Sequence, residues 1–120
     1  MSFLPIYRTL LANTDVTDLI DVATKLHEDV APVDAVAPYV VWQALSGRAN
    51  NHLDCPANFD DTLYQVMVYD TDRKRAYEIR DVIRSALENQ SWIENPSING
   101  WESDTKLYVR GFDANWILER

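Results

Sequence analysis

Apolar residues recur at helical spacing in two stretches near the N-terminus. The first covers residues 3–12, where Pro5 is compatible with a first helical turn. The second covers residues 15–22, with Val16 on its inner side and Thr14 placed to cap its start. Both stretches are therefore predicted to form short helices.

A longer and clearer helix is predicted for residues 73–89. Its start follows Asp70-Thr71-Asp72, whose side chains are suited to helix capping. Its apolar positions form one stripe: Ala76, Ile79, Ile83, Ala86 and Leu87. The charged residues between these positions then lie on the solvent-exposed face of the helix.

The remaining apolar stretches have strand character. Residues 39–46 (YVVWQALS) and 62–69 (TLYQVMVY) are rich in β-branched and aromatic residues and predict two strands. Residues 106–118 predict the last strand, within which Gly111 indicates either a bulge or a close backbone approach. The less regular predictions are a short edge strand at 25–30, a loop or a hairpin with extended arms at 47–61, and an irregular, then extended, segment at 92–102.

The predicted order is α-α-β-β-β-α-β-β, which indicates an α+β fold. We expect a mostly antiparallel sheet of about four to five strands, with the helices packed on one face. A chain of 120 residues fits one domain, spanning 1–120, that buries roughly two-thirds of its unfolded surface.

The two central strands are apolar on both faces, although the helices can cover only one. Uncovered apolar surface usually marks association, and interfaces favour aromatic residues. The sequence therefore predicts an associating domain, with Trp42, Tyr64 and Trp116 among the contacts between subunits.

Composition excludes several functions. The formal net charge of −8 predicts repulsion from nucleic acid and anionic lipid, and no apolar run is long enough to span a membrane. The three glycines lie too far apart for a phosphate loop, and the one cysteine, Cys55, permits no internal disulfide. The cysteine suits a reducing cytoplasm.

Three short groups of residues suggest chemistry only weakly. His27-Glu28-Asp29 would place alternate side chains on opposite faces of a strand, which disfavours a metal site. His52 and Cys55 could form a base and a nucleophile, but neighbouring carboxylates would raise the thiol pKa. Asp54 with its acidic neighbours lacks the cleft that a glycosidase needs. We therefore expect no enzyme activity, no cofactor and no metal.

The order of segments resembles the tail-completion (tail-terminator) family of long-tailed bacteriophages. The entry to the first long strand reads D-V-A-P and then P-Y-V-V, and an L-D loop, a Y-Q-V strand and a helix ending in A-L follow. These segments are Asp29–Pro32, Pro38–Val41, Leu53-Asp54, Tyr64–Val66 and Ala76–Leu87. The resemblance covers nearly the whole chain, but Cys55-Pro56 stands where the family often has a glycine.

The resemblance implies a structural subunit of a ring, often sixfold, that caps the head-proximal end of the tail tube. Its partners would be further copies of itself, the tail-tube protein and the head-connector protein, first in the host cytoplasm and then in the virion tail. DNA would pass through the ring without specific binding.

On this interpretation the 47–61 segment projects toward the tube or the lumen of the ring. Further interface residues are then Arg48, Asn51, His52 and Asp54. The alternative is a small acidic protein-binding module, similar to an immunity protein or an antitoxin, that has no catalytic activity. The mass in solution discriminates between them, because such a module would pair with a basic protein as a monomer.

Overall fold

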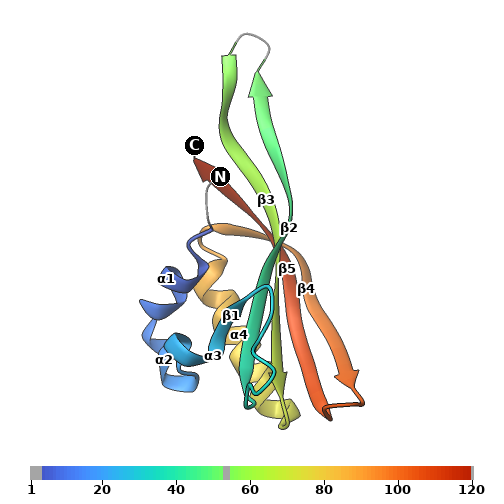
Figure 1. Ribbon diagram of the computed structural model, residues 1–120. Helices are drawn as coiled ribbons and strands as arrows, with labels where there is room; N and C mark the ends of the chain where they lie inside the picture. Colours follow the sequence, from blue (N-terminus) through green and yellow to red (C-terminus); the bar gives the residue numbers. More distant parts are fainter. Residues whose placement is uncertain (1–3, 53–54, 120) are drawn as a thin grey trace.

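The computed structural model describes residues 4–52 and 55–119. In this part of the chain, four helices cover a sheet of five strands (Figure 1). The helices are α1 (Ile6–Leu11), α2 (Thr14–Leu19), α3 (Val22–Lys25) and α4 (Arg73–Leu87). The strands are β1 (Leu26–Glu28), β2 (Tyr39–His52), β3 (Cys55–Asp70), β4 (Ser91–Glu102) and β5 (Leu107–Glu119). The α+β class and the predicted order are confirmed, with the single turn of α3 added.

The strands lie in the order β1-β2-β3-β5-β4. All neighbours are antiparallel except β1 and β2, which run parallel, so the sheet is mostly antiparallel as predicted. β3 is the central strand, where Val68 lies opposite Val40 and Val66 lies opposite Phe112. The two edges of the sheet are β1 and β4.

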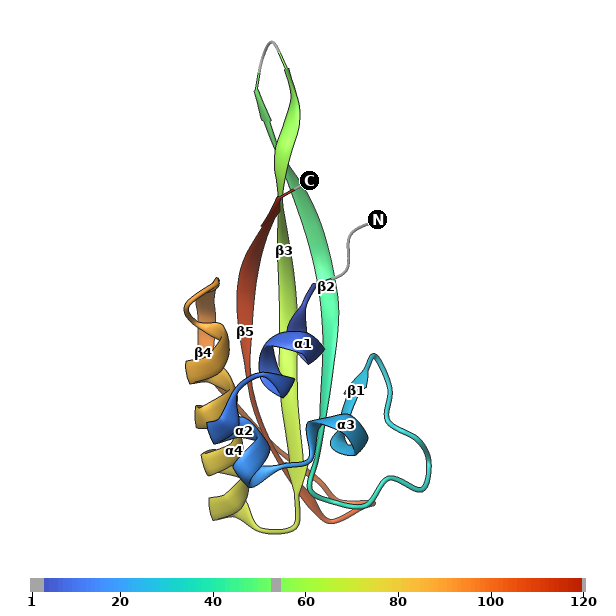
Figure 2. The same cartoon turned by 90° about the vertical axis from the view of Figure 1, so that its left-hand side faces the viewer.

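The core lies between the helices and one face of the sheet (Figure 2). Alternate strand residues point toward this face, among them Val66, Val68 and Phe112, which are fully buried. The buried stripe of α4 is the predicted one: Ala76, Ile79, Ile83, Ala86 and Leu87. Each large aliphatic side chain contributes about 1.5–3 kcal/mol when buried, so this layer holds the helices on the sheet.

The start of α2 differs from the prediction. The Asn13 side chain caps the helix, since its Oδ1 accepts hydrogen bonds from the N–H groups of Asp15 (3.0 Å) and Val16 (3.2 Å). Thr14 is already helical, so the prediction that it is the cap is wrong. The helix ends before Ile20, whose extended backbone (φ −147°, ψ 141°) turns the chain into α3.

Within the segment 47–61, residues 47–52 and 55–61 form the two arms of a long hairpin, one of the two predicted alternatives. The backbones of its arms pair, with Gly47 opposite Thr62 and Asn50 opposite Phe59. Figure 1 shows the hairpin projecting beyond the rest of the molecule, at the end far from the β4–β5 turn.

The segment predicted to be irregular and then extended is the edge strand β4. Its pairing with β5 is interrupted by register shifts between Ile93 and Asn95 and between Asn95 and Ile98. Pro96 lies within the second shift. Because proline has no N–H to donate, a bulge on an edge strand is one of the few places in a sheet that tolerates it.

Gly111 allows β3 and β5 to approach closely, the second of the two roles predicted for it. A Cβ atom there would lie 2.5 Å from Met67 Sδ and closer still to the Val66 carbonyl oxygen. A Cβ atom on Gly100, by contrast, would meet Val109 at an ordinary 3.6 Å.

Candidate functional site

The three aromatic residues predicted as subunit contacts lie inside the protein. Trp42, Tyr64 and Trp116 are 5%, 0% and 6% exposed and belong to the core beneath the helices. The Tyr64 ring packs against Phe112 and Trp116, with centroids 6.5 and 6.3 Å apart. Because the helices already cover this face of the sheet, a neighbouring subunit cannot reach these side chains, and their role is to support the sheet.

The buried phenol of Tyr64 is used for structure. Its hydroxyl lies 2.6 Å from Ser91 Oγ, in the first residue of β4. Burial raises the pKa of Tyr64 to about 12, and the hydrogen bond with Ser91 offsets only part of that effect. The phenol therefore stays neutral and ties the start of β4 to the central strand.

The other predicted contacts belong to the projecting hairpin. Arg48, Asn51 and His52 lie on its β2 arm, and the backbone of Arg48 is paired with that of Asp61 in β3. Asp54 lies outside the described residues. The arm therefore places three of the four residues on a part of the chain that stands clear of the helices (Figure 1).

The face of the sheet opposite the helices is partly apolar. Tyr39 and Tyr69 stack there with their ring centroids 5.0 Å apart, and both are half-buried. Burial, followed by the negative charge of Glu102, raises the pKa of both tyrosines. Farther along β2 and β3 the face becomes polar, where Gln43 Nε2 donates a hydrogen bond to Gln65 Oε1 at 3.4 Å.

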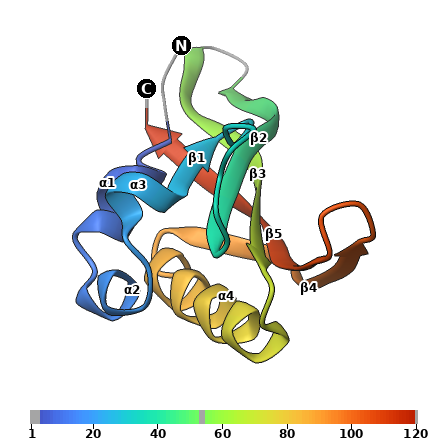
Figure 3. The same cartoon turned by 60° about the horizontal axis from the view of Figure 1, so that its bottom comes forward.

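The two edges of the sheet carry the most exposed large apolar side chains of the described residues. Val30, Val33 and Val36 lie in the loop between β1 and β2, and Trp92 and Trp101 lie in β4. Figure 3, in which the bottom of Figure 1 comes forward, shows β1 and β4 at opposite edges of the sheet. Sequence reasoning missed these residues, although the two valines between Pro32 and Pro38 were a usable signal.

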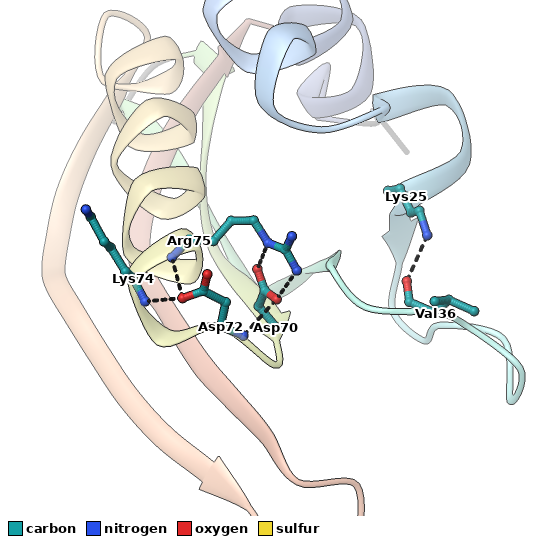
Figure 4. Close-up of polar contacts among 6 residues, drawn as sticks. All are labelled: Lys25, Val36, Asp70, Asp72, Lys74 and Arg75. Atoms are coloured by element: carbon teal, nitrogen blue, oxygen red, sulfur yellow. Dashed lines mark hydrogen bonds and ion pairs between the residues drawn. The ribbon is translucent and has the colours of Figure 1, made fainter.

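An ion pair fixes the junction between β3 and α4 (Figure 4). Asp70, whose side chain is fully buried, accepts hydrogen bonds from Arg75 Nε at 2.6 Å and Nη2 at 2.7 Å. Burial disfavours the charge on Asp70, but the bonds from Arg75 and from the backbone of Asp72 outweigh burial and lower the pKa of Asp70. Asp72 caps α4 as predicted, because its Oδ1 accepts hydrogen bonds from the backbone N–H groups of Lys74 and Arg75.

One cavity of the described residues is acidic. An open cavity of about 560 Å³ between α2 and α4 is lined by the carboxylates Asp15, Asp18 and Asp81 without a basic side chain. Among the residues described, no three His, Cys, Asp or Glu side chains gather as a metal site would require. His27 instead packs edge-on against Tyr39, with centroids 6.4 Å apart. No helix within the described ranges has the length and apolar character to cross a membrane.

Similarity to known proteins gives the family. The family model described as "Tail completion protein gp17" matches residues 5–116. The chain belongs to this family. Its fold is similar to that of a chain in a solved structure, the "Virion of native gene transfer agent (GTA) particle", with a TM-score of 0.71 at 13% sequence identity. That similarity covers 96% of this chain and 92% of the other, whereas no curated protein matches in sequence.

The match confirms the resemblance noted in the order of sequence segments, from the P-Y-V-V strand to the helix that ends in A-L. As a tail-completion protein, the chain has a structural role in a phage-type tail.

Proposed function

We propose that this tail-completion protein is a non-enzymatic subunit of a ring that caps the head-proximal end of the tail tube and joins it to the head connector. The family match over residues 5–116 is the observation that carries the proposal. The fold shared with a chain of a gene transfer agent virion supports a structural role, because that chain is part of an assembled particle. The ring assembles in the host cytoplasm and becomes part of the virion tail.

The shape of the chain suits contact with several partners at once. The hairpin of β2 and β3 extends away from the helices, so it can reach a neighbouring ring or tube while the body of the subunit packs within its own ring (Figure 1). We assign contact with the tail-tube protein, or with the lumen of the ring, to the hairpin and to Arg48, Asn51, His52 and Asp54.

The charge of the chain suits a channel for DNA. The formal net charge is −8, and Asp54, Asp60 and Asp61 belong to the hairpin segment. If this segment lines the lumen, its carboxylates repel the phosphates of passing DNA, which then slides without being held. Neither a cofactor nor specific binding of nucleic acid enters this role.

Assembly of tubes in vitro tests the proposal. Tail-tube protein from the same particle is polymerised with and without the chain, and tube lengths and ends are recorded by electron microscopy. We expect shorter tubes that carry a ring at one end only. Tubes of unchanged length with bare ends, at an excess of the chain, would contradict the proposal, and a stable monomer that binds a basic protein would favour the immunity-like alternative.

A pair of variants tests the hairpin. The double substitution Arg48→Ala with His52→Ala alters the projecting arm, whereas Arg73→Ala removes an exposed arginine from the start of α4. We expect the hairpin variant to reduce end binding and the α4 variant to leave it unchanged. Equal binding by both variants would remove the hairpin from the contact with the tube.

A further inference from the structure

A buried arginine, Arg110 of β5, has no carboxylate partner among the described residues. Arg110 is only 7% exposed, whereas the ion pairs in the described part of the chain are made by Arg75, Arg80 and Arg84. Arginine is almost never buried to this extent without a paired charge, because burial costs the charge its hydration. The burial of Arg110 therefore requires an explanation from its surroundings.

The guanidinium of Arg110 lies against two tyrosine rings. Its central carbon, Cζ, is 4.8 Å from the ring centroid of Tyr77 in α4 and 5.5 Å from that of Tyr108 in β5. Both rings attract the cation through their π-electrons. These contacts stabilise the positive charge and fix the position of the group, but a ring face supplies no oxygen atom to accept a hydrogen bond.

Only one nitrogen of this guanidinium is hydrogen-bonded to the described residues. Nη1 donates to the carbonyl oxygens of Gly100, at 3.0 Å, and Val109, at 2.8 Å, which uses both of its hydrogens. Nε is shielded from solvent and has no partner in the described ranges. Nη2 makes no hydrogen bond there either, but it is not among the shielded atoms. The edge formed by Nε and Nη2 is thus free, and its Nη2 corner reaches the surface.

Arg75 of the same chain shows what such an edge binds. Its Nε and Nη2 donate to the two carboxylate oxygens of Asp70, at 2.6 and 2.7 Å. The spacing of the two nitrogens matches that of the two oxygens, so pairs of this kind are strong and directional. Two acidic side chains of this region, Asp70 and Asp81, are already held by Arg75 and Arg80. A carboxylate from another molecule is therefore the group that fits the free edge of Arg110.

An exposed aromatic side chain lies on the same face of the sheet. Trp101 of β4 packs against Tyr108 with ring centroids 4.8 Å apart, yet it remains 53% exposed. The backbone of Trp101 is paired with that of Tyr108, and Asn99 is paired with Arg110. Tryptophan, tyrosine and arginine are the residues that contribute most to binding in protein interfaces. A partner whose acidic group reaches Arg110 thus also finds apolar surface at Trp101.

We propose that Tyr77, Trp101, Tyr108 and Arg110 form a docking site for an acidic side chain of a partner protein, whose carboxylate binds the free edge of Arg110. These four residues are named the Arg110 site. A protein fits better than a nucleic acid. The neighbouring Arg80 is not available, because its Nε and Nη2 lie 3.2 and 3.1 Å from Asp81. A chain of phosphates would find a single cation on a protein whose formal net charge of −8 repels it.

The position of the Arg110 site leaves it free when the hairpin is engaged. Arg110 lies near the start of β5, beside the β4–β5 turn, and the hairpin projects at the other end of the molecule (Figure 1). A partner on the hairpin therefore leaves the Arg110 site clear, so one subunit can hold a partner at each end. This inference does not depend on the proposed ring, and its tests use the chain without tail-tube protein.

An NMR titration of the isotope-labelled, full-length protein tests the site directly. The Nε–H signal of Arg110 is assigned through its own side chain, and a hexaglutamate peptide is added. We expect this signal to move and to saturate, because Nε–H gains an acceptor, whereas the Nε–H signal of Arg75, already bonded to Asp70, stays in place. A hexaglutamine peptide should move neither signal. An Arg110 signal that ignores hexaglutamate, or that moves only with a thymidine oligonucleotide, would overturn the inference.

Two tryptophan variants supply a matched control. Trp101→Ala removes the exposed ring of the site, whereas Trp92→Ala removes a ring that is 72% exposed toward the other end of β4, where Trp92 is paired with Asn115. We expect Trp101→Ala to weaken binding of hexaglutamate at least about fivefold and Trp92→Ala to leave it unchanged. Equal affinities of these two variants would overturn the site.

The substitution Arg110→Lys separates the shape of the guanidinium from its charge. Lysine keeps the positive charge but lacks the two nitrogens that face a carboxylate together, so we expect binding of hexaglutamate to weaken at least about tenfold. Circular dichroism checks that the variant is folded, and if it is not, the two tryptophan variants decide the question. Wild-type affinity in a folded Arg110→Lys protein would overturn the inference, because any nearby charge would then suffice.

Discussion

Replacing Arg75 by alanine should destabilise the protein more than any other loss of a charge on α4. Arg75 makes two hydrogen bonds to Asp70, at 2.6 and 2.7 Å, and the Asp70 side chain is fully buried. After Arg75→Ala the carboxylate keeps only backbone donors, such as the N–H of Asp72 at 3.0 Å. A buried charge that loses its partner is costly because water does not replace the lost bonds in full.

The magnitude follows from the exposure of the two partners. Removing one partner of a fully buried ion pair costs about 3–5 kcal/mol. The Arg75 side chain is 43% exposed, so water can enter the space that it leaves, and backbone donors to Asp70 remain. We therefore expect a smaller loss, about 2–3 kcal/mol in the free energy of unfolding at neutral pH.

Urea unfolding followed by circular dichroism measures this loss, with Arg73→Ala as the matched control. Arg73 has the same chemistry at the exposed start of the same helix, so its replacement should change stability by less than about 0.5 kcal/mol. If both variants unfold at the same urea concentration, the buried pair does not stabilise the junction, and the reasoning is refuted.

The dependence on pH gives a second check. The pKa of Asp70 is lowered in the folded state from its ordinary value of 3.8, so the contribution of the pair is complete above that pH. It is lost as the pH falls through the folded pKa, where the carboxylate becomes protonated. The difference between wild type and Arg75→Ala should therefore be constant near neutral pH and narrow below pH 3.8. A difference that grows with acidity would contradict this assignment.

Three further predictions can be checked by the same unfolding assay. Gly111→Ala should cost about 1–3 kcal/mol, because its Cβ would meet the β3 backbone and Met67, whereas the control Gly100→Ala should be tolerated; equal effects would contradict the close approach. Ser91→Ala should cost about 1–3 kcal/mol by leaving the buried Tyr64 hydroxyl without its partner, and combining it with Tyr64→Phe should restore part of the loss. Asn13→Ala should cost about 1 kcal/mol through the lost cap of α2, and an unchanged midpoint would show that the cap is dispensable.

The elements that sequence predicts well are those whose signals are local. The stripe of α4 and its cap Asp72 lie within a few residues of one another, and both are confirmed. The long central strands are confirmed for the same reason, because β-branched and aromatic residues concentrate in each of them. The α+β class follows from the order of these elements.

The parts that sequence reasoning missed depend on contacts between distant segments. Trp42 and Trp116 lie in strands that are apolar on both faces, and only the placement of the helices decides which face is buried. The arms of the hairpin contain polar residues, so their pairing is visible only when β2 and β3 are aligned. In β4 the alternation is broken by the register shifts around Pro96, which concealed the exposed Trp92 and Trp101.

The continuity of β3 has a mechanical consequence. One strand runs without interruption from the hairpin into the centre of the sheet, and it is flanked there by both β2 and β5. Hydrogen bonds between antiparallel strands lie across the strand direction, so a pull along β3 loads many of them together in shear instead of opening them one at a time. A pulling force on the hairpin would thus be shared by β2, β3 and β5, so the sheet resists extension along this direction.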